Sequence, residues 1–228
     1  MRIGRIGEQS GYSGLSSAEC WCSRPASNVV FCSIRDRGLY PRCADQCWVK
    51  VSDSGSAMNL WLRLARVWLG ARRRPALDPT ESSEIRVRAW PHDLDVWGHV
   101  NGGRYLTLSD LGRLDLFVRL GVVRVVLAER WVLPLGSVAV RFRRPWKLLQ
   151  RCVLRTHILG WDDKWAYIST DFLRGDQLVA TVVCRATTLD RSGNRIPTDE
   201  VVARVGFEGD PIEVPDDIRT LFGRQPKP

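Results

Sequence analysis

The stretch DLDVWGHVNGGRY, residues 93–105, joins a strand-like segment to a long apolar helix. Acids, glycines, an imidazole and an amide occupy much of it: Asp93, Asp95, Gly98, His99, Asn101, Gly102 and Gly103. So many polar and glycine residues at one junction are unusual, and the segments on either side show what they connect.

The flanking segments predict a strand before this stretch and a helix after it. Residues 84–90 (EIRVRAW) alternate apolar and polar side chains, as half-buried strands do. Residues 104–121 repeat apolar side chains at helical spacing, and Gly121 stands where a helix is expected to end. The apolar positions of that helix are Leu106, Leu108, Leu111, Leu114, Phe117 and Val118.

After a short apolar link, four strand-like runs of about ten residues follow, separated by turn residues. The runs are residues 136–146, 151–162, 164–174 and 177–191. The order of strand, long helix and antiparallel meander predicts an α+β fold in which one helix packs on one sheet.

This layout and the motif together resemble the hotdog-fold acyl-CoA thioesterases of the 4-hydroxybenzoyl-CoA thioesterase type. The resemblance is carried by D-x-x-G-H-V-N-x-x-R-Y at residues 95–105 and by RFRRP at residues 141–145. It covers residues 84–190, and more loosely the chain from Met58 onward. It implies a hotdog fold, hydrolysis of an acyl-CoA thioester to a free acid and CoA, and no metal or cofactor. It also implies a homodimer or homotetramer with active sites at the dimer interface.

The resemblance assigns the catalytic carboxylate to Asp95, as a nucleophile or as a base that activates water. It assigns the oxyanion contact to the backbone N–H at or near Gly102, because the first N–H groups of a helix are unpaired and carry partial positive charge. Gly102 and Gly103 let a thioester approach the backbone closely, since no Cβ stands in the way. His99 and Asn101 complete the candidate catalytic set.

Each of these polar residues also has a structural interpretation. Asp95 could cap a turn, and Asn101 is a natural helix cap. His99 could act as a base or shape the turn by hydrogen bonding. We interpret Asp93 as a structural or capping acid.

The candidate substrate-binding residues are Trp97, Gly103, Tyr105, Arg141 and Arg143. Because CoA is polyanionic, the basic run RFRRPWK (141–147) could hold it at the surface. The alternative is that arginines alternating along a strand form its solvated face. The acyl group needs an apolar slot, which Trp97 could help to line.

The composition argues against several other classes of protein. The chain has 228 residues, 44% of them hydrophobic, and a formal charge of +9. Its arginines are scattered through the strands, so we expect a basic surface or an anionic small molecule, and no nucleic acid, as partner. Cys152 and Cys184 lie in strand-like runs and are expected to be buried thiols. The five earlier cysteines match no zinc spacing, and no nucleophile elbow or phosphate loop occurs.

The chain divides into four parts. Residues 1–57 show no helical or strand periodicity, and we interpret them as an over-extended reading frame before a start at Met58; a genuine disordered or metal-binding extension is the alternative. Residues 58–80 are expected to form a basic amphipathic helix and linker, and residues 81–192 the hotdog domain. Residues 193–228 form a C-terminal extension that includes a short helix.

The segment after Met58 has an apolar helical stripe of Leu60, Trp61, Leu64, Val67 and Trp68. Its arginines have no acid nearby, so the helix could lie on an anionic membrane surface, or pack on its own domain or on a partner subunit. It is too short and too charged to cross a bilayer, which needs about 20 apolar residues. We expect a protein that is cytoplasmic or peripheral to the inner membrane.

Thioester hydrolysis is the favoured function. A non-catalytic hotdog protein that binds acyl thioesters, a membrane or a protein partner is the alternative. A third possibility, hydration or dehydration of an enoyl thioester, would need a pair such as His99 with Asp95. Retention of the Asp95–Gly98–His99–Asn101 frame favours the enzyme.

Overall fold

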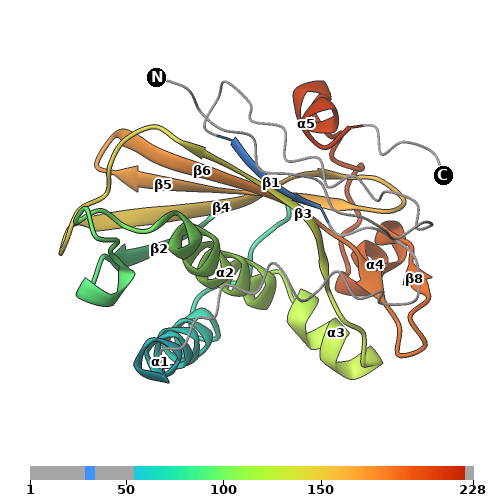
Figure 1. Ribbon diagram of the computed structural model, residues 1–228. Coiled ribbons are helices and arrows are strands. Elements are labelled where there is room, and N and C mark those ends of the chain that lie inside the picture. The colour runs from blue at the N-terminus through green and yellow to red at the C-terminus, as the bar shows by residue number, and fades with distance from the viewer. Residues whose placement is uncertain (1–28, 34–53, 224–228) are drawn as a thin grey trace, which may run out of the picture.

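The computed structural model describes residues 29–33 and 54–223, and its centre is an antiparallel sheet of six strands (Figure 1). The strand order is β1-β3-β6-β5-β4-β2. The strands are β1 (Val29–Ser33), β2 (Ser83–Arg88), β3 (Leu135–Phe142), β4 (Arg151–Trp161), β5 (Ala166–Arg174) and β6 (Gln177–Ala186). A small second sheet joins β7 (Thr188–Leu189) and β8 (Arg195–Ile196).

Helix α2 (Gly102–Arg119) lies across one face of the large sheet, and the main core fills the space between them (Figure 1). Leu108 and Leu111 of the helix and Leu154 and Phe172 of the sheet are all at most 1% exposed. Each such side chain contributes about 1.5–3 kcal/mol by leaving water. This confirms the α+β hotdog fold, with the strand and the helix on either side of the motif where the sequence predicts them.

Helix α1 (Ser54–Ala71) packs on the outer side of α2, so that α2 is covered by the sheet on one side and by α1 on the other (Figure 1). The helix expected after Met58 is confirmed, although it begins at Ser54. Leu60, Leu64 and Val67 pack against the core, but Trp61 is 70% exposed. Trp61 follows Leu60 directly and therefore points about 100° away around the helix axis.

Two connections differ from the sequence prediction. The apolar link after α2 contains a further helix, α3 (Val122–Glu129), which starts where Gly121 takes a left-handed φ of 80°. The four-strand meander is wrong in one respect: β4, β5 and β6 are consecutive neighbours, but β3 pairs with β6 and not with β4. Alternation along a strand fixes which side chains face the core, and it does not say which strand lies alongside.

The two ends of the chain add to this frame. Residues 1–57 were expected to hold no strand, yet β1 pairs with the edge of β3; the other residues before Ser54 lie outside the described part. Beyond β8 come α4 (Thr198–Val205) and α5 (Asp216–Leu221), which confirms a short C-terminal helix. The α5 segment lies on the sheet face opposite α2, where Phe222 packs with Tyr167 and Val183 (Figure 1).

Candidate active site

Asp93 is the buried anchor of the motif. Its carboxylate is fully buried and accepts hydrogen bonds from Arg63 of α1 and Arg104 of α2, each at 2.8 Å, and from the Trp90 N–H at 2.9 Å. Burial by itself would raise the pKa of Asp93, but the hydrogen bonds from Arg63, Trp90 and Arg104 outweigh it and hold the pKa below the usual carboxyl range. These contacts confirm a structural role for this acid.

Asp95, two residues further on, is half-exposed and sits in a tight turn. Its Oδ1 accepts hydrogen bonds from the backbone N–H groups of Trp97 at 2.9 Å and His99 at 3.2 Å. Gly98 takes a φ of 75° in this turn, a conformation that favours glycine. Among the described residues no hydrogen bond engages the second carboxylate oxygen, Oδ2. Asp95 therefore caps the turn through one oxygen and leaves the other without a described partner.

The start of α2 leaves one backbone donor open. Asn101 caps the helix: its side-chain oxygen accepts from the Gly103 N–H at 2.8 Å, and its carbonyl accepts from the Arg104 N–H at 2.9 Å. Its own N–H donates to the Asp93 carbonyl at 2.9 Å. Within the described part of the chain, the Gly102 N–H has no acceptor. Gly102 is exposed, so this N–H is the one that an external oxygen can reach.

A pocket of about 370 Å³ opens beside this helix end. It is formed by the motif and by the loop that follows β3, and its lining residues are His99, Val100, Gly102, Tyr105, Phe142, Arg143, Arg144, Pro145 and Trp146. The two segments are joined by backbone contacts, because the Val100 N–H donates to the Trp146 carbonyl at 2.8 Å and His99 bridges to Lys147. Residues about 45 positions apart thus form one wall.

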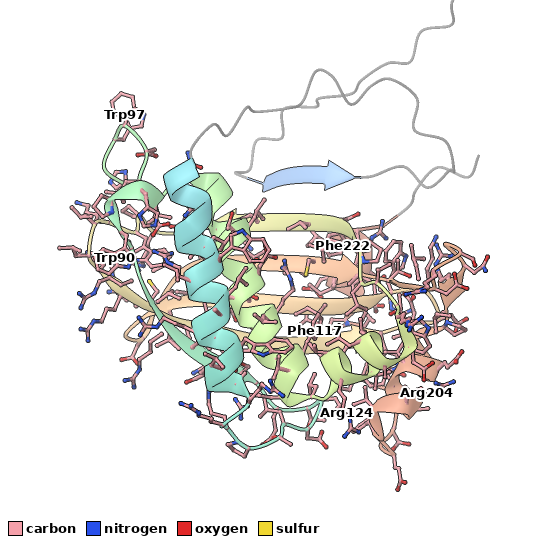
Figure 2. The ribbon with its side chains drawn as sticks, turned by 90° about the horizontal axis from the view of Figure 1, so that it is seen from below. Trp90, Trp97, Phe117, Arg124, Arg204 and Phe222 are labelled. Atoms are coloured by element: carbon pink, nitrogen blue, oxygen red, sulfur yellow. The ribbon has the colours of Figure 1, made fainter. Side chains whose placement is uncertain are left out.

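The predicted site residues divide into two groups. Those that line the pocket are His99, Gly102, Tyr105 and Arg143; those that do not are Asp95, Trp97, Asn101, Gly103 and Arg141. Trp97 is 81% exposed at the tip of the motif loop, where it points away from the rest of the molecule (Figure 2). Arg141 lies on the sheet face opposite α2, because side chains alternate along β3 and the neighbouring Phe142 faces the helix.

Three aromatic side chains line the pocket, and of these the sequence predicted Tyr105 but not Phe142 or Trp146. The Tyr105 ring meets Phe142 and Phe172 edge-to-face at centroid distances of 5.1 Å, and Trp146 at 5.9 Å. Trp146 is fully buried and donates its indole N–H to the Gln150 carbonyl. The alternation of β3 could have placed Phe142 on the helix face, but nothing local marks Trp146 as buried. These rings form a rigid apolar floor under the pocket.

Residues 54–223 contain no second group of side chains that suggests a reactive thiol or a metal site. Cys152 and Cys184 are buried free thiols, as the sequence predicts, and burial raises the pKa of Cys152 to about 12. In the part that the structure describes, no group of three histidine, cysteine or acidic side chains could hold a metal ion. No helix in this part has the length and apolar character needed to span a membrane.

Comparison with known proteins identifies relatives of this chain. Protein THEM6 of Xenopus laevis is 30% identical over 146 residues, which cover 62% of this chain and 70% of that protein. Protein THEM6 of Danio rerio is 28% identical over 143 residues, or 60% of this chain and 71% of that protein. Among solved structures, the probable thioesterase YbaW of Escherichia coli has a TM-score of 0.51 at 18% identity and covers 54% of this chain and 95% of that one. That likeness shows the fold.

A family model also matches more than half of this chain. The model of the Thioesterase-like superfamily matches residues 89–222, a span that begins just before the motif and ends after α5. It includes every residue of the candidate pocket and both of the motif's acids. The chain therefore belongs to the thioesterase-like superfamily.

Proposed function

We propose that this protein hydrolyses an acyl-CoA thioester to a free carboxylic acid and CoA. The observation that carries the proposal is the open N-terminal end of α2, where Gly102 is exposed, lines a pocket and has no acceptor for its N–H among the described residues. A thioester carbonyl placed there would be polarised by that N–H and by the positive end of the helix dipole. One such donor contributes roughly 3–4 kcal/mol of transition-state stabilisation.

Asp95 is the proposed nucleophile or general base. The hydrogen bonds from Trp97 and His99 fix its Oδ1 and leave Oδ2 available for a substrate carbonyl carbon or for a water molecule. Asp93, the other acid of the motif, is excluded because Arg63, Arg104 and Trp90 occupy its oxygens in a fully buried position. The motif therefore divides its two acids into a structural one and a reactive one.

The CoA portion of the substrate is proposed to lie along the loop after β3. Arg143 and Arg144 are exposed at the pocket and can face its phosphates. Arg141 takes no part, because it lies across the sheet. A second copy of the chain is proposed to complete the site, since the pocket is open on its outer side and β2 leaves a sheet edge uncovered within the described residues.

One observation favours a second candidate, a non-catalytic hotdog protein that binds acyl thioesters. Asp95 does not line the pocket within a single chain. Its carboxylate also caps the turn, and this structural role would retain Asp95 even in a protein without catalytic activity. The two candidates differ in turnover and not in the binding of a thioester.

The experiment follows free-thiol release from a panel of short, long and aromatic acyl-CoAs by the full chain and by Asp95→Asn. An asparagine keeps a side-chain oxygen for the Trp97 and His99 N–H groups, so the turn is retained while the reactive carboxylate is lost. We expect turnover to fall by roughly 10²-fold or more. Asp176→Asn is the matched control, because Asp176 is exposed in the turn between β5 and β6 and does not line the pocket.

Circular dichroism and thermal melting establish that both variants fold. If Asp95→Asn is folded and as active as the wild-type protein, Asp95 is not the catalytic group. If the wild-type protein binds acyl-CoAs by calorimetry and hydrolyses none of the panel, the binding protein is the correct interpretation.

A further inference from the structure

Helix α1 has a second apolar face that its own domain leaves uncovered. One face packs on α2 through Leu60, Leu64 and Val67. On the other side Trp61, Leu62 and Leu69 are 70%, 63% and 55% exposed. Single exposed apolar side chains are ordinary, but three large ones within nine residues on the outside of one helix form a patch that marks an interaction surface.

A groove of about 390 Å³ continues this face between α1, α2 and α3. Its lining combines apolar and basic side chains: Trp68, Ala71, Arg72, Arg74, Ala76, Val118, Arg119, Val123, Arg124 and Leu127. Figure 2 shows Arg124 near the C-terminal end of α1, at the opposite end of the molecule from Trp97. The groove is therefore separate from the candidate active site, whose lining shares no residue with it.

Two of the four groove arginines are already paired. Arg74 lies 2.7 Å and Arg119 lies 3.7 Å from the buried carboxylate of Asp115. Arg72 lies over the Trp68 ring, 5.7 Å from its centroid, and contacts no acid in the described part of the chain. Arg124 is exposed and likewise has no acidic partner there.

The same excess of positive charge runs along α1. Residues 60–77 hold five arginines and no aspartate or glutamate. Arg63 and Arg74 neutralise the buried acids Asp93 and Asp115. That leaves Arg66, Arg72 and Arg73 exposed beside the apolar patch, with no acid opposite them among the described residues.

Charge decides which occupant fits this surface. A symmetric pairing of two copies through α1 would place these unpaired arginines of both copies close together, which like-charge repulsion opposes. The headgroup region of a bilayer with anionic phospholipids offers the matching arrangement, since tryptophan and leucine insert at the headgroup boundary and arginines contact the phosphates.

We propose that the α1–α3 face, defined as Trp61, Leu62, Leu69, Arg66, Arg72, Arg73 and Arg124, docks the protein on the surface of a membrane that carries anionic phospholipids. The proposed membrane surface shares only Trp61 with the apolar stripe that the sequence indicates, because Leu60, Leu64 and Val67 pack against the core of the domain. The proposal stands on its own contacts and does not depend on the proposed hydrolysis.

The test is co-sedimentation of the full chain with phosphatidylcholine vesicles, with and without phosphatidylglycerol. We expect binding to the vesicles with phosphatidylglycerol, and we expect it to weaken as salt shortens the Debye length from about 10 Å at 0.1 M to about 3 Å at 1 M. Equal binding to both kinds of vesicle, or binding to neither, would overturn the proposal.

Two variants locate the surface. Arg72→Gln/Arg124→Gln should weaken binding roughly 30-fold, since each basic residue near an anionic surface contributes about 1 kcal/mol and about 1.4 kcal/mol is tenfold in affinity. Arg86→Gln/Arg151→Gln makes the same change of charge at exposed positions on β2 and β4 and should bind like the wild-type protein. Equal losses in the two double variants would mean that net charge alone governs binding, which contradicts a defined face.

Trp61→Ser/Leu62→Ser/Leu69→Ser tests the apolar part of the face. We expect loss of vesicle binding, with the mass in solution, measured by light scattering, unchanged. A change in mass with vesicle binding retained would show that the patch joins two copies of the chain and would overturn the proposal.

Discussion

The two ends of helix α2 share one arrangement of buried ion pairs, and only one end has a further acid. At each end a fully buried acid is held by two arginines: Asp93 by Arg63 and Arg104 near the start, and Asp115 by Arg74 and Arg119 near the finish. In each pair one arginine comes from α1 or from the segment just after it, so that α1 is tied to α2 at both ends.

Only the N-terminal end carries a second acid. Among the described residues Asp95 has one oxygen without a partner, and its turn leads into the open backbone donor at Gly102, which lines the pocket. At the C-terminal end the carboxylate of Asp115 is instead closed off further by the Ser83 hydroxyl at 2.5 Å. In the proposed mechanism the buried ion pairs hold the frame, and reactivity depends on the acid that the ion pairs leave unpaired.

The largest expected effect comes from neutralising the buried acids. Asp93→Asn should lower the free energy of unfolding by about 3–5 kcal/mol, because it leaves Arg63 and Arg104 charged and nearly buried. Asp115→Asn should cost less, about 1–3 kcal/mol, because the Arg74 side chain is 36% exposed and can return to water. Urea denaturation measures the free energy of unfolding of both variants. An equal loss for the two would show that the exposure of the arginines does not determine the cost of neutralising the acid.

Acid should weaken the N-terminal ion pairs of Asp93. The folded protein holds the pKa of Asp93 below its usual range, so this acid contributes stability above the unfolded carboxyl pKa of about 3.9. That contribution is lost as the pH falls through the lower pKa of the folded state. We expect the melting temperature of the wild-type protein to fall across this window, and that of Asp93→Asn to change less. Parallel curves for the two proteins would contradict the linkage.

Alanine substitutions at two glycines of α2 should have different, smaller effects on stability. A Cβ at Gly112, in the middle of the helix, would collide with the hydroxyl of Thr156, which is itself hydrogen-bonded to Thr170 at 3.1 Å. We expect Gly112→Ala to cost about 1–3 kcal/mol by overpacking. A Cβ at Gly102 would lie 3.5 Å from Phe142, an ordinary contact, so Gly102→Ala should cause no loss of stability. Thermal melts of the two variants, each compared with the wild-type protein, check the contrast.

The smallest effect is expected at the tip of the motif loop. Trp97 makes its one described hydrogen bond through its backbone N–H, and its side chain is 81% exposed. Trp97→Ser should therefore change the free energy of unfolding by no more than about 0.5 kcal/mol. A clear loss of stability would show that the ring is buried against a second copy, and its dependence on protein concentration would identify that contact.

The sequence by itself determined the local structure and the location of the candidate site. The alternation of residues 84–90, the helical repeat of residues 104–121 and the Asn101 cap are short-range patterns, and the folded chain follows them. The motif also predicted a candidate site at the start of α2, where the pocket of the folded chain opens, because glycines and a capping residue have local conformational causes.

Only the tertiary structure decided how those pieces meet. Arg63 and Asp93 are 30 residues apart, and nothing in the sequence marks one arginine of α1 as an internal counterion while others remain at the surface. Trp146 likewise becomes part of the pocket because the loop after β3 crosses to the motif. The pairing of β3 with β6 also joins distant segments. Local periodicity fixes the face of each element, but contacts between distant segments depend on the packing of the whole chain.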